Sequence, residues 1–411
     1  MLYKLLQFLM RQSLRIYYRD ILVQGKDYID KDKPLLIAAT HPNSFLDAII
    51  LGAVIDRPLF FLARSDVFNR KWSDYILRKL NLIPIYRLQE GHNNLNKNDA
   101  TFEACFEILE RNGAVLIFAE GISLTDKKVR PPKKGLARIG FGTENRNDFK
   151  LNVEVLPVGI NYEVADQLRN RILVQIAKPI SLKEYQESFN KNANTAYVQL
   201  NEELYSKLKR SSIEVEDEEI FDFIAKRFHG IDYSFDKLKG ISLKIQSLKE
   251  KDQLVYNDLK KHINKLISLE KSNQFDSNYI GRKKQTLLTI LLLVPSMFGF
   301  ILNAPPLFLA NLISNKKVKL IEFYASVKVV LGCILWLIWA SIIVFFIFPF
   351  SIINSFLYII SLLLLGEAYL FVNKQIKISF NQNRYKRFKQ NDLYSSYSDS
   401  INKINTILNI G

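Results

Sequence analysis

Two long apolar runs dominate the C-terminal part of the chain. Residues 329–350 contain no charged side chain, and residues 351–373 contain only Glu367. As a helix, each run is long enough to cross the hydrocarbon core of a bilayer, which is about 30 Å thick. A third apolar region, residues 286–313, is interrupted at residues 303–306 by the sequence Asn-Ala-Pro-Pro. The pattern predicts an integral membrane protein.

Clusters of basic residues flank these apolar segments. They are Arg282, Lys283 and Lys284, then Lys316, Lys317 and Lys319, then Lys374 and Lys377. The positive-inside tendency places such clusters on the cytoplasmic side, so an even number of crossings must separate them. Residues 286–313 are too short for two full crossings. We therefore expect the transmembrane region, residues 281–375, to consist of a re-entrant hairpin followed by two spanning helices.

Upstream, short β-rich runs alternate with segments of helical periodicity. The apolar runs are residues 35–40, 59–63, 82–86, 114–119, 153–160 and 172–177, and residues 66–80 and 99–111 have helical periodicity. Alternation of this kind is typical of a largely parallel or mixed sheet. We predict an α/β domain over residues 30–200, with a mixed sheet covered by helices, followed by a helical segment and C-terminal transmembrane helices.

The two ends of the chain lie outside this domain. Basic residues recur at spacings of seven and four from Lys4 to Arg19, on one face of an amphipathic helix predicted for residues 1–29. The helix either lies in the cytoplasmic membrane interface or packs on the following domain, and we favour the interface. Residues 376–411 are polar and basic, and we expect them to form a cytoplasmic tail.

Residues 201–280 are charged, free of proline and contain a heptad-like seam. Apolar positions recur at alternating spacings of four and three from residue 241 to residue 269, with Asp252 and His262 as polar interruptions. The seam predicts either a homodimer through residues 241–269 or packing on a preceding helix that carries Ile220. We favour packing within the chain.

Composition narrows the class of protein. The chain has 411 residues, 48% of them hydrophobic, which excludes a disordered chain. Its two cysteines exclude a disulfide scaffold and a four-ligand zinc ribbon. A net charge of +16 fits nucleic acid or an anionic membrane surface. Because the basic clusters adjoin apolar runs and no nucleic-acid-binding motif is present, we expect membrane lipid as a partner and no nucleic acid.

His41 and Asp47 are the leading candidates for catalysis. His41 directly follows a predicted buried strand, and Asp47 lies one to two turns into the helix predicted after it. A carboxylate facing back toward the imidazole fixes its tautomer and leaves the other ring nitrogen as a general base. The alternative is an ordinary capping role for Asp47 at the helix start.

Three further strand ends carry residues that could contact a substrate. They are Arg87 after one strand, then Glu120, Gly121 and Ser123 after the next with Lys134 in a basic stretch downstream, and Pro157 inside a later apolar run. A carboxylate, a flexible glycine and basic side chains at a strand end can bind a phosphorylated substrate. The alternative is a solvated loop capped by Glu120. Pro157 predicts an edge strand or a bent strand near a site.

In this order and at these spacings, the four segments resemble the glycerolipid acyltransferase superfamily, which contains the glycerol-3-phosphate and 1-acyl-glycerol-3-phosphate acyltransferases. His41 with Asp47 matches the first block of the superfamily, Arg87 the second, Glu120 with Gly121 the third, and Pro157 the fourth. The resemblance covers about residues 30–180. Two departures are visible: five residues rather than four separate His41 from Asp47, and Ala119 stands where proline is usual.

The resemblance implies a glycerol-3-phosphate acyltransferase-like fold. It also implies transfer of a fatty acyl group from acyl-CoA or acyl carrier protein, as co-substrate, to glycerol-3-phosphate or 1-acyl-glycerol-3-phosphate in phospholipid biosynthesis. Asp47 would orient His41 as the general base, and Arg87 would bind the acceptor phosphate. Glu120, Ser123 and Lys134 would support the glycerol and phosphate.

No cofactor or metal is expected for this chemistry, and the catalytic domain is expected on the cytoplasmic face. Two alternatives stay open. The first is another lysophospholipid, alcohol or amine as acceptor for the same His41–Asp47 pair. The second is a catalytically silent lipid-binding membrane scaffold, against which the joint presence of His41, Asp47, Arg87 and Glu120 argues.

Overall fold

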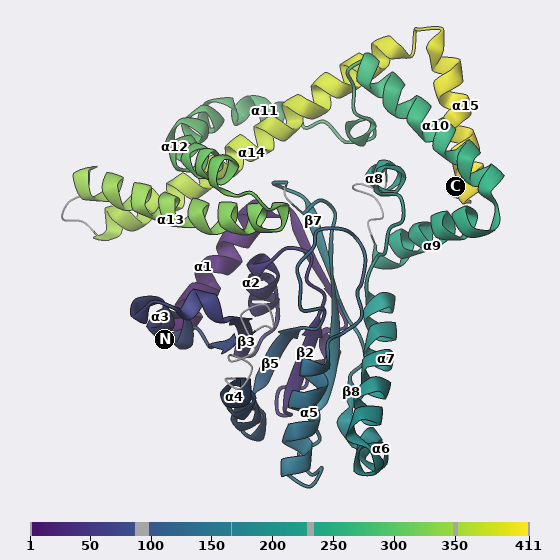
Figure 1. Ribbon diagram of the computed structural model, residues 1–411. Helices are drawn as coiled ribbons and strands as arrows, with labels where there is room; N and C mark the ends of the chain where they lie inside the picture. The colour runs from purple at the N-terminus through teal and green to yellow at the C-terminus, as the bar shows by residue number, and fades with distance from the viewer. Residues whose placement is uncertain (1, 87–97, 166, 228–233, 348–351, 410–411) are drawn as a thin grey trace. The chain divides into compact units, whose positions relative to one another are not determined.

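The computed structural model describes residues 2–86, 98–165, 167–227, 234–347 and 352–409 (Figure 1). The chain divides into two compact units. The first comprises Met1–Glu214 and Lys319–Val329, and the second comprises Val215–Val318 and Val330–Gly411. All the strands lie in the first unit, and the described part of the second is built from helices.

An eight-stranded sheet forms the centre of the first unit. Its strands are β1 (Asp20–Gln24), β2 (Leu35–Ala39), β3 (Leu59–Arg64), β4 (Leu82–Ile85), β5 (Ala114–Phe118), β6 (Glu154–Tyr162), β7 (Arg171–Ile176) and β8 (Ile180–Ser181). Their order is β1-β7-β6-β2-β5-β3-β4, with β8 beside β6. β6 runs antiparallel to β7 and β8, and the other pairs are parallel. The predicted mixed sheet is confirmed.

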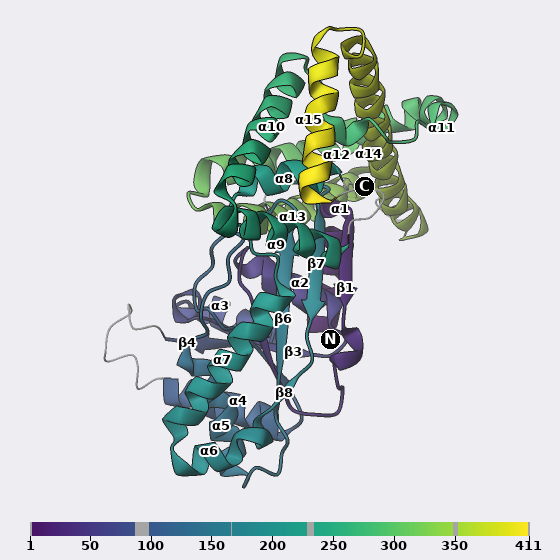
Figure 2. The same ribbon diagram turned by 90° about the vertical axis from the view of Figure 1, so that its right-hand side faces the viewer.

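Helices cover both faces of this sheet (Figures 1 and 2). They are α1 (Leu2–Tyr17) and α2 (Phe45–Val54) on one face, and α4 (Asn98–Glu110), α5 (Lys134–Arg146) and α7 (Ala193–Ser211) on the other, with the shorter α3 (Lys71–Lys79) and α6 (Gln186–Lys191). The central strand β2 is buried throughout, and its side chains alternate between two hydrophobic clusters. Ile37 packs toward α2, whereas Leu36 and Ala38 pack toward α5 and α7, as the two-residue period of a strand requires.

The amino-terminal segment forms a helix and a strand. The expectation of one helix over residues 1–29 is wrong in its second half, because the β-branched and aliphatic residues of β1 pair in parallel with β7. The side chains of Gln7 and Arg11 donate hydrogen bonds to backbone carbonyls of α2, at 2.6 and 2.7 Å. Leu5 and Phe8 are exposed. An interfacial role for α1 stays a prediction.

Pro157 does not lie on an edge strand, which corrects one of the two interpretations offered for it. β6 lies between β2 and β7 in the sheet, and Pro157 pairs with Ala38 of β2. On the other side of β6, β7 pairs from Val158 onward and β8 pairs only up to Val155. Pro157 therefore falls between these two ladders, where its missing N–H leaves no hydrogen bond broken.

The second unit is helical in its described part. Its helices are α8 (Glu218–Arg227), α9 (Phe235–Lys251), α10 (Gln253–Ser272), α11 (Thr286–Leu291), α12 (Leu293–Lys317), the greater part of α13 (Ile321–Ile347), α14 (Ile352–Phe388) and α15 (Leu393–Leu408). The boundary predicted at residue 375 falls inside α14. The residues expected to form a polar tail are largely helical, and Tyr397 of α15 is buried in an aromatic cluster with Phe275 and Phe388.

The heptad-like seam is divided between two helices. α9 ends at Lys251, and the Asp252 carboxylate accepts a hydrogen bond from the Val255 N–H at 3.1 Å, which caps α10. The seam is thus divided at Asp252, one of its two polar interruptions. Ile245 and Leu259 from the seam are buried within the chain, and so is Ile220 of α8. Dimerisation through residues 241–269 stays a prediction.

The predicted break at residues 303–306 is absent, because α12 continues through Pro305 and Pro306. A proline cannot donate to the carbonyl four residues earlier, which for Pro306 is that of Leu302. The Trp339 indole N–H donates to this carbonyl instead, at 2.8 Å. A side chain of α13 thus satisfies a backbone group that the proline frees, and the predicted re-entrant hairpin is wrong.

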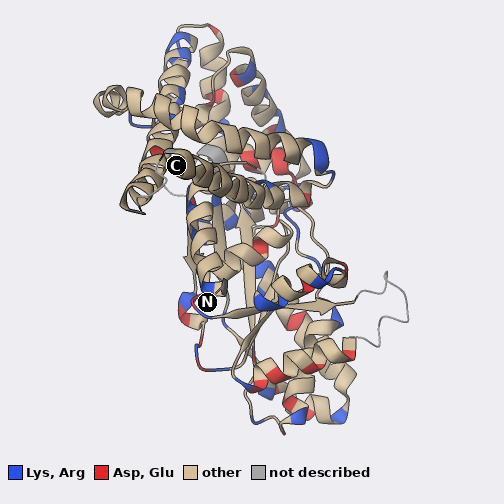
Figure 3. Cartoon of the chain, turned by 90° about the vertical axis from the view of Figure 1, so that its left-hand side faces the viewer, with Lys and Arg blue, Asp and Glu red and all other residues tan. Residues whose placement is uncertain are grey.

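Three helices are long and apolar enough to cross a membrane. The candidate spans are Leu293–Lys317, Ile321–Phe346 and Ile353–Phe388, and the most apolar stretch of each contains at most two charged residues. Figure 3 shows long helical stretches without basic or acidic residues. These helices suggest association with a membrane.

Candidate active site

His41 and Asp47 meet just beyond the carboxyl end of β2. His41 follows Thr40 after the strand, and Asp47 lies in the first turn of α2. His41 Nδ1 is 2.9 Å from Asp47 Oδ2. The Asp47 side chain is 0% exposed, and that of His41 is 13% exposed. The carboxylate therefore holds Nδ1, which leaves Nε2 as the ring nitrogen that can accept a proton from a substrate.

Three donors hold the Asp47 carboxylate. Besides His41, the backbone N–H of Asn43 donates to Oδ2 at 2.8 Å, and the hydroxyl of Tyr162 donates to Oδ1 at 2.6 Å. Desolvation by burial, together with the neighbouring Asp47 charge, raises the pKa of Tyr162 well above its ordinary value. Tyr162 is therefore a permanent donor at neutral pH. The carboxylate is thus held where it can stabilise an imidazolium at His41.

The ring of His41 is also fixed from one side by an aromatic residue. Phe118, the last residue of β5, stacks on the imidazole with 3.7 Å between ring centroids and 10° between planes. β5 lies beside β2 in parallel, so both side chains leave the sheet at the same edge. The stacking holds the plane of the imidazole, and the contact with Asp47 keeps Nδ1 toward the carboxylate.

Two residues shortly after Glu120 and Gly121 hold the His41 loop. Ser44 has a φ of 49°, in a region that residues other than glycine adopt only when neighbouring contacts hold them. Its N–H donates to the Ser123 hydroxyl at 2.8 Å, and the Leu124 N–H donates to the His41 carbonyl at 3.2 Å. The structure thus brings Ser123 to the catalytic loop, as a support for its backbone.

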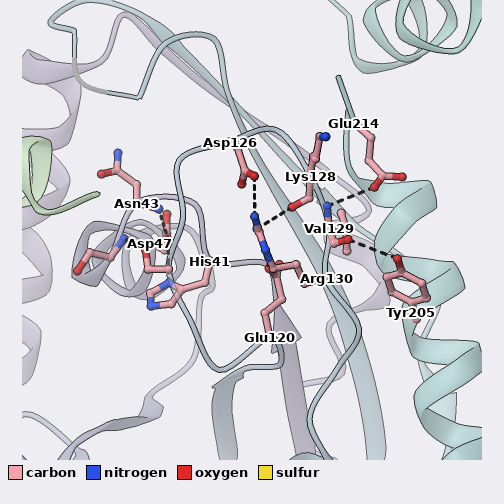
Figure 4. A network of polar contacts seen from close by, with 12 residues as sticks. His41, Asn43, Asp47, Glu120, Asp126, Lys128, Val129, Arg130, Tyr205 and Glu214 are labelled. Carbon is pink, nitrogen blue, oxygen red and sulfur yellow. Dashed lines mark hydrogen bonds and ion pairs between the residues drawn. The ribbon is translucent and has the colours of Figure 1, made fainter. Parts of the chain in front are cut away.

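Glu120 lies beneath the same loop in a polar network (Figure 4). Its carboxylate is 4% exposed and accepts the backbone N–H of His41 and of Arg130. Arg130 Nη1 lies 3.8 Å from Glu120 Oε2, and Arg130 Nη2 lies 2.5 Å from Asp126 Oδ2. Burial raises the pKa of Glu120 from 4.5 to about 7, and the charge of Arg130 opposes this effect. Glu120 thus joins the His41 backbone to the partly exposed guanidinium of Arg130.

The segment that carries Arg130 is itself held against α7 (Figure 4). The Val129 N–H donates to the Glu214 carboxylate at 3.2 Å, and the Val129 carbonyl accepts from the Tyr205 hydroxyl at 3.4 Å. At the start of the segment, Gly121 has a φ of 72°, where a side chain would be strained. Gly121 therefore turns the chain away from Glu120.

The structure does not bring every predicted residue to the pair. Lys134 is exposed at the start of α5, where it donates to Asn194 of α7 at 2.9 Å. Pro157 lies within β6, where it pairs with Ala38 of β2. Arg87 lies outside the described residues, so its predicted contact with phosphate stays a prediction. Sequence reasoning missed Tyr162 as a functional residue, because it reaches Asp47 only through the pairing of β6 with β2.

Two sequence comparisons relate the chain to known acyltransferases. The sequence model of the family described as "Acyltransferase" matches residues 20–161. A 1-acyl-sn-glycerol-3-phosphate acyltransferase of Bacillus subtilis (strain 168) is 26% identical over 120 residues, which are 29% of this chain and 55% of that protein. The chain therefore spans about half the length of this curated relative.

A solved structure, the 1-acyl-sn-glycerophosphate (LPA) acyltransferase PlsC from Thermotoga maritima, is also similar. It is 19% identical, with a TM-score of 0.34, over 50% of this chain and 79% of that one. The family model and the relative in Bacillus subtilis confirm the resemblance to the glycerolipid acyltransferase superfamily, and residues 20–161 are the part of the chain that matches the acyltransferase family.

Proposed function

We propose that this acyltransferase-family domain transfers a fatty acyl group from acyl-CoA or acyl carrier protein to a hydroxyl of glycerol-3-phosphate or 1-acyl-glycerol-3-phosphate. The observation that carries the proposal is the His41–Asp47 pair, with 2.9 Å between Nδ1 and Oδ2. Its setting adds support, because the carboxylate is fully buried and Phe118 fixes the imidazole ring. The acyl acceptor is proposed from the superfamily and from the relative in Bacillus subtilis.

Acyl transfer to a hydroxyl needs one general base, and His41 takes this role. His41 Nε2 accepts the hydroxyl proton as the oxygen attacks the thioester carbonyl, so that a C–O bond forms. The C–S bond then breaks, and the leaving thiolate takes the proton from the imidazolium, which restores His41. Asp47 orients the ring and stabilises its charged form. Cys105 is an unsuitable nucleophile, because it is buried and its burial raises its pKa to about 12.

Purified protein in proteoliposomes provides the direct test. Radiolabelled glycerol-3-phosphate and 1-acyl-glycerol-3-phosphate are supplied in turn, each with palmitoyl-CoA or palmitoyl–acyl carrier protein. We expect one phosphorylated acceptor to react at least about tenfold faster than monoacylglycerol, since a charge-assisted contact to phosphate adds this much discrimination. An equal rate with monoacylglycerol would favour a neutral alcohol acceptor. No product from any pair would favour the lipid-binding scaffold.

We also propose that the acyltransferase domain lies on the cytoplasmic face and that α13 and α14 cross the membrane as a hairpin. No candidate span lies in the described residues between 215 and 285, and Lys319–Val329 belongs to the acyltransferase unit. The intervening segment 286–317 must then begin and end on one side of the bilayer. Since α12 is unbroken, we place segment 286–317 along the interface, between the basic clusters at residues 282–284 and 316–319.

Cysteine labelling tests this topology in intact and permeabilised vesicles. Cysteines introduced as Lys284→Cys and Lys316→Cys, in a Cys333→Ser background, are expected to react with an impermeant maleimide from the same side. The buried Cys105 serves as the unreactive reference. Labelling of the two introduced cysteines from opposite sides would show that α12 crosses the membrane alone.

A further inference from the structure

The first turns of α13 are buried in the core of the acyltransferase domain. Ser326 is 0% exposed, and so is Ala325. Ala325 and Val329 belong to the same hydrophobic cluster as Leu46 and Ile50 of α2. Lys319–Val329 lies far outside the matched residues 20–161, yet it is part of this compact unit. The first turns of α13 therefore add buried side chains to the core of this domain from outside residues 20–161.

Ser326 makes two hydrogen bonds to the turn that joins His41 to α2. Its hydroxyl donates to the Asn43 carbonyl at 2.9 Å and accepts from the Leu46 N–H at 3.2 Å. The Leu46 N–H also donates to the Asn43 carbonyl at 3.2 Å, which closes a turn. The Ser326 hydroxyl therefore reinforces a turn that already has its own hydrogen bond. The first N–H groups of a helix need partners from outside the helix. The Leu46 N–H is buried away from water, and the Ser326 hydroxyl supplies a partner for it.

Asn43 links these hydrogen bonds to the Asp47 carboxylate. The Asn43 N–H donates to Asp47 Oδ2, which also accepts from His41 Nδ1. On the other side of the loop, Ser123 accepts the N–H of Ser44, whose φ is 49°. Two serines, distant in sequence, thus hold the backbone on either side of a turn that would not keep this conformation by itself.

We propose that Ser326 is a positioning residue for the His41–Asp47 pair, so that residues 319–329 complete the active site. The inference rests on the acyl-transfer function proposed above. Ser326 acts through the residue Asn43, whose carbonyl accepts the Ser326 hydroxyl and whose N–H donates to Asp47. An acyltransferase domain ending before α13 lacks this support, so catalysis depends on the docking of a segment that continues into a candidate membrane span.

Kinetics of Ser326→Ala in the full-length protein provide the first test. We expect kcat to fall about tenfold, the effect of one buried hydrogen bond, with KM for both substrates within about twofold of the native values. Ser314→Ala is the matched control, because Ser314 is also 0% exposed but lies in α12. In an Asp47→Asn background, Ser326→Ala should lower kcat no further, since the residue through which it acts has been changed.

Hydrogen exchange provides a test that does not depend on activity. In Ser326→Ala, the Leu46 amide is expected to exchange about tenfold faster than in the native protein, and Ser314→Ala should leave it unchanged. If the native protein transfers no acyl group, faster exchange still supports the positioning of the turn, and only the proposed reaction fails. The inference is overturned by a native kcat in Ser326→Ala, by an equal further loss in the Asp47→Asn background, or by unchanged exchange.

Discussion

Replacing His41 with alanine is expected to lower kcat for acyl transfer by about a thousandfold or more, because the reaction then has no general base. The imidazole is held on two sides, by Asp47 at 2.9 Å and by the Phe118 ring. Water that enters the space left by the ring lacks both the basicity and the fixed position of Nε2. KM should change little, since the proton is transferred only in the transition state. Initial rates at saturating donor and acceptor measure the effect.

His262→Ala is the matched control for this variant. His262 has the same side-chain exposure, 13%, but lies on α10 beside Asp258 and Ser400. We expect its kcat to stay within about twofold of the native value, as for most substitutions outside the machinery. A His41→Ala protein that keeps its melting temperature and more than a tenth of its kcat would refute His41 as the base.

Much of the acyltransferase domain follows from local pattern. The six apolar runs recognised between residues 35 and 177 are strands, and each carries a local signal, a short β-rich run bounded by turn residues. β1 is harder to predict, since it follows an amphipathic helix and becomes a strand only by pairing with β7. The same limit applies to α12. Its two prolines predict a break in the helix, because they remove backbone hydrogen bonds. Trp339 on another helix replaces one of these by donating to the Leu302 carbonyl.

The candidate site also has a part that local sequence predicts and a part that depends on tertiary structure. His41 and Asp47 are six positions apart, so a loop and one helical turn are enough to bring them together. Tyr162 reaches the same carboxylate only because β6 lies beside β2 in the sheet. Ser326 lies 280 positions beyond Leu46, and no local signal joins the two. A sequence thus predicts the catalytic pair, whereas the groups that orient the pair depend on tertiary structure.

Asp47→Asn is expected to lower kcat by about a thousandfold while the fold is retained. The carboxylate accepts three hydrogen bonds, from His41, Asn43 and Tyr162. An asparagine can keep its carbonyl oxygen toward His41 and Asn43 and turn its NH₂ toward the Tyr162 hydroxyl, whose proton can rotate away. Geometry is then largely kept, but the negative charge that stabilises the imidazolium is lost. The measurement is kcat beside the melting temperature.

Asp56→Asn, an exposed carboxylate just beyond α2, is the control and should leave kcat unchanged. The competing interpretation makes Asp47 a helix cap only, which predicts the opposite pattern: a lower melting temperature with kcat within about threefold of the native value. The two outcomes separate because a cap acts on the free energy of unfolding, whereas a partner of the imidazolium acts on the transition state. Loss of kcat at an unchanged melting temperature would therefore assign Asp47 to catalysis, since burial of a polar side chain alone cannot produce it.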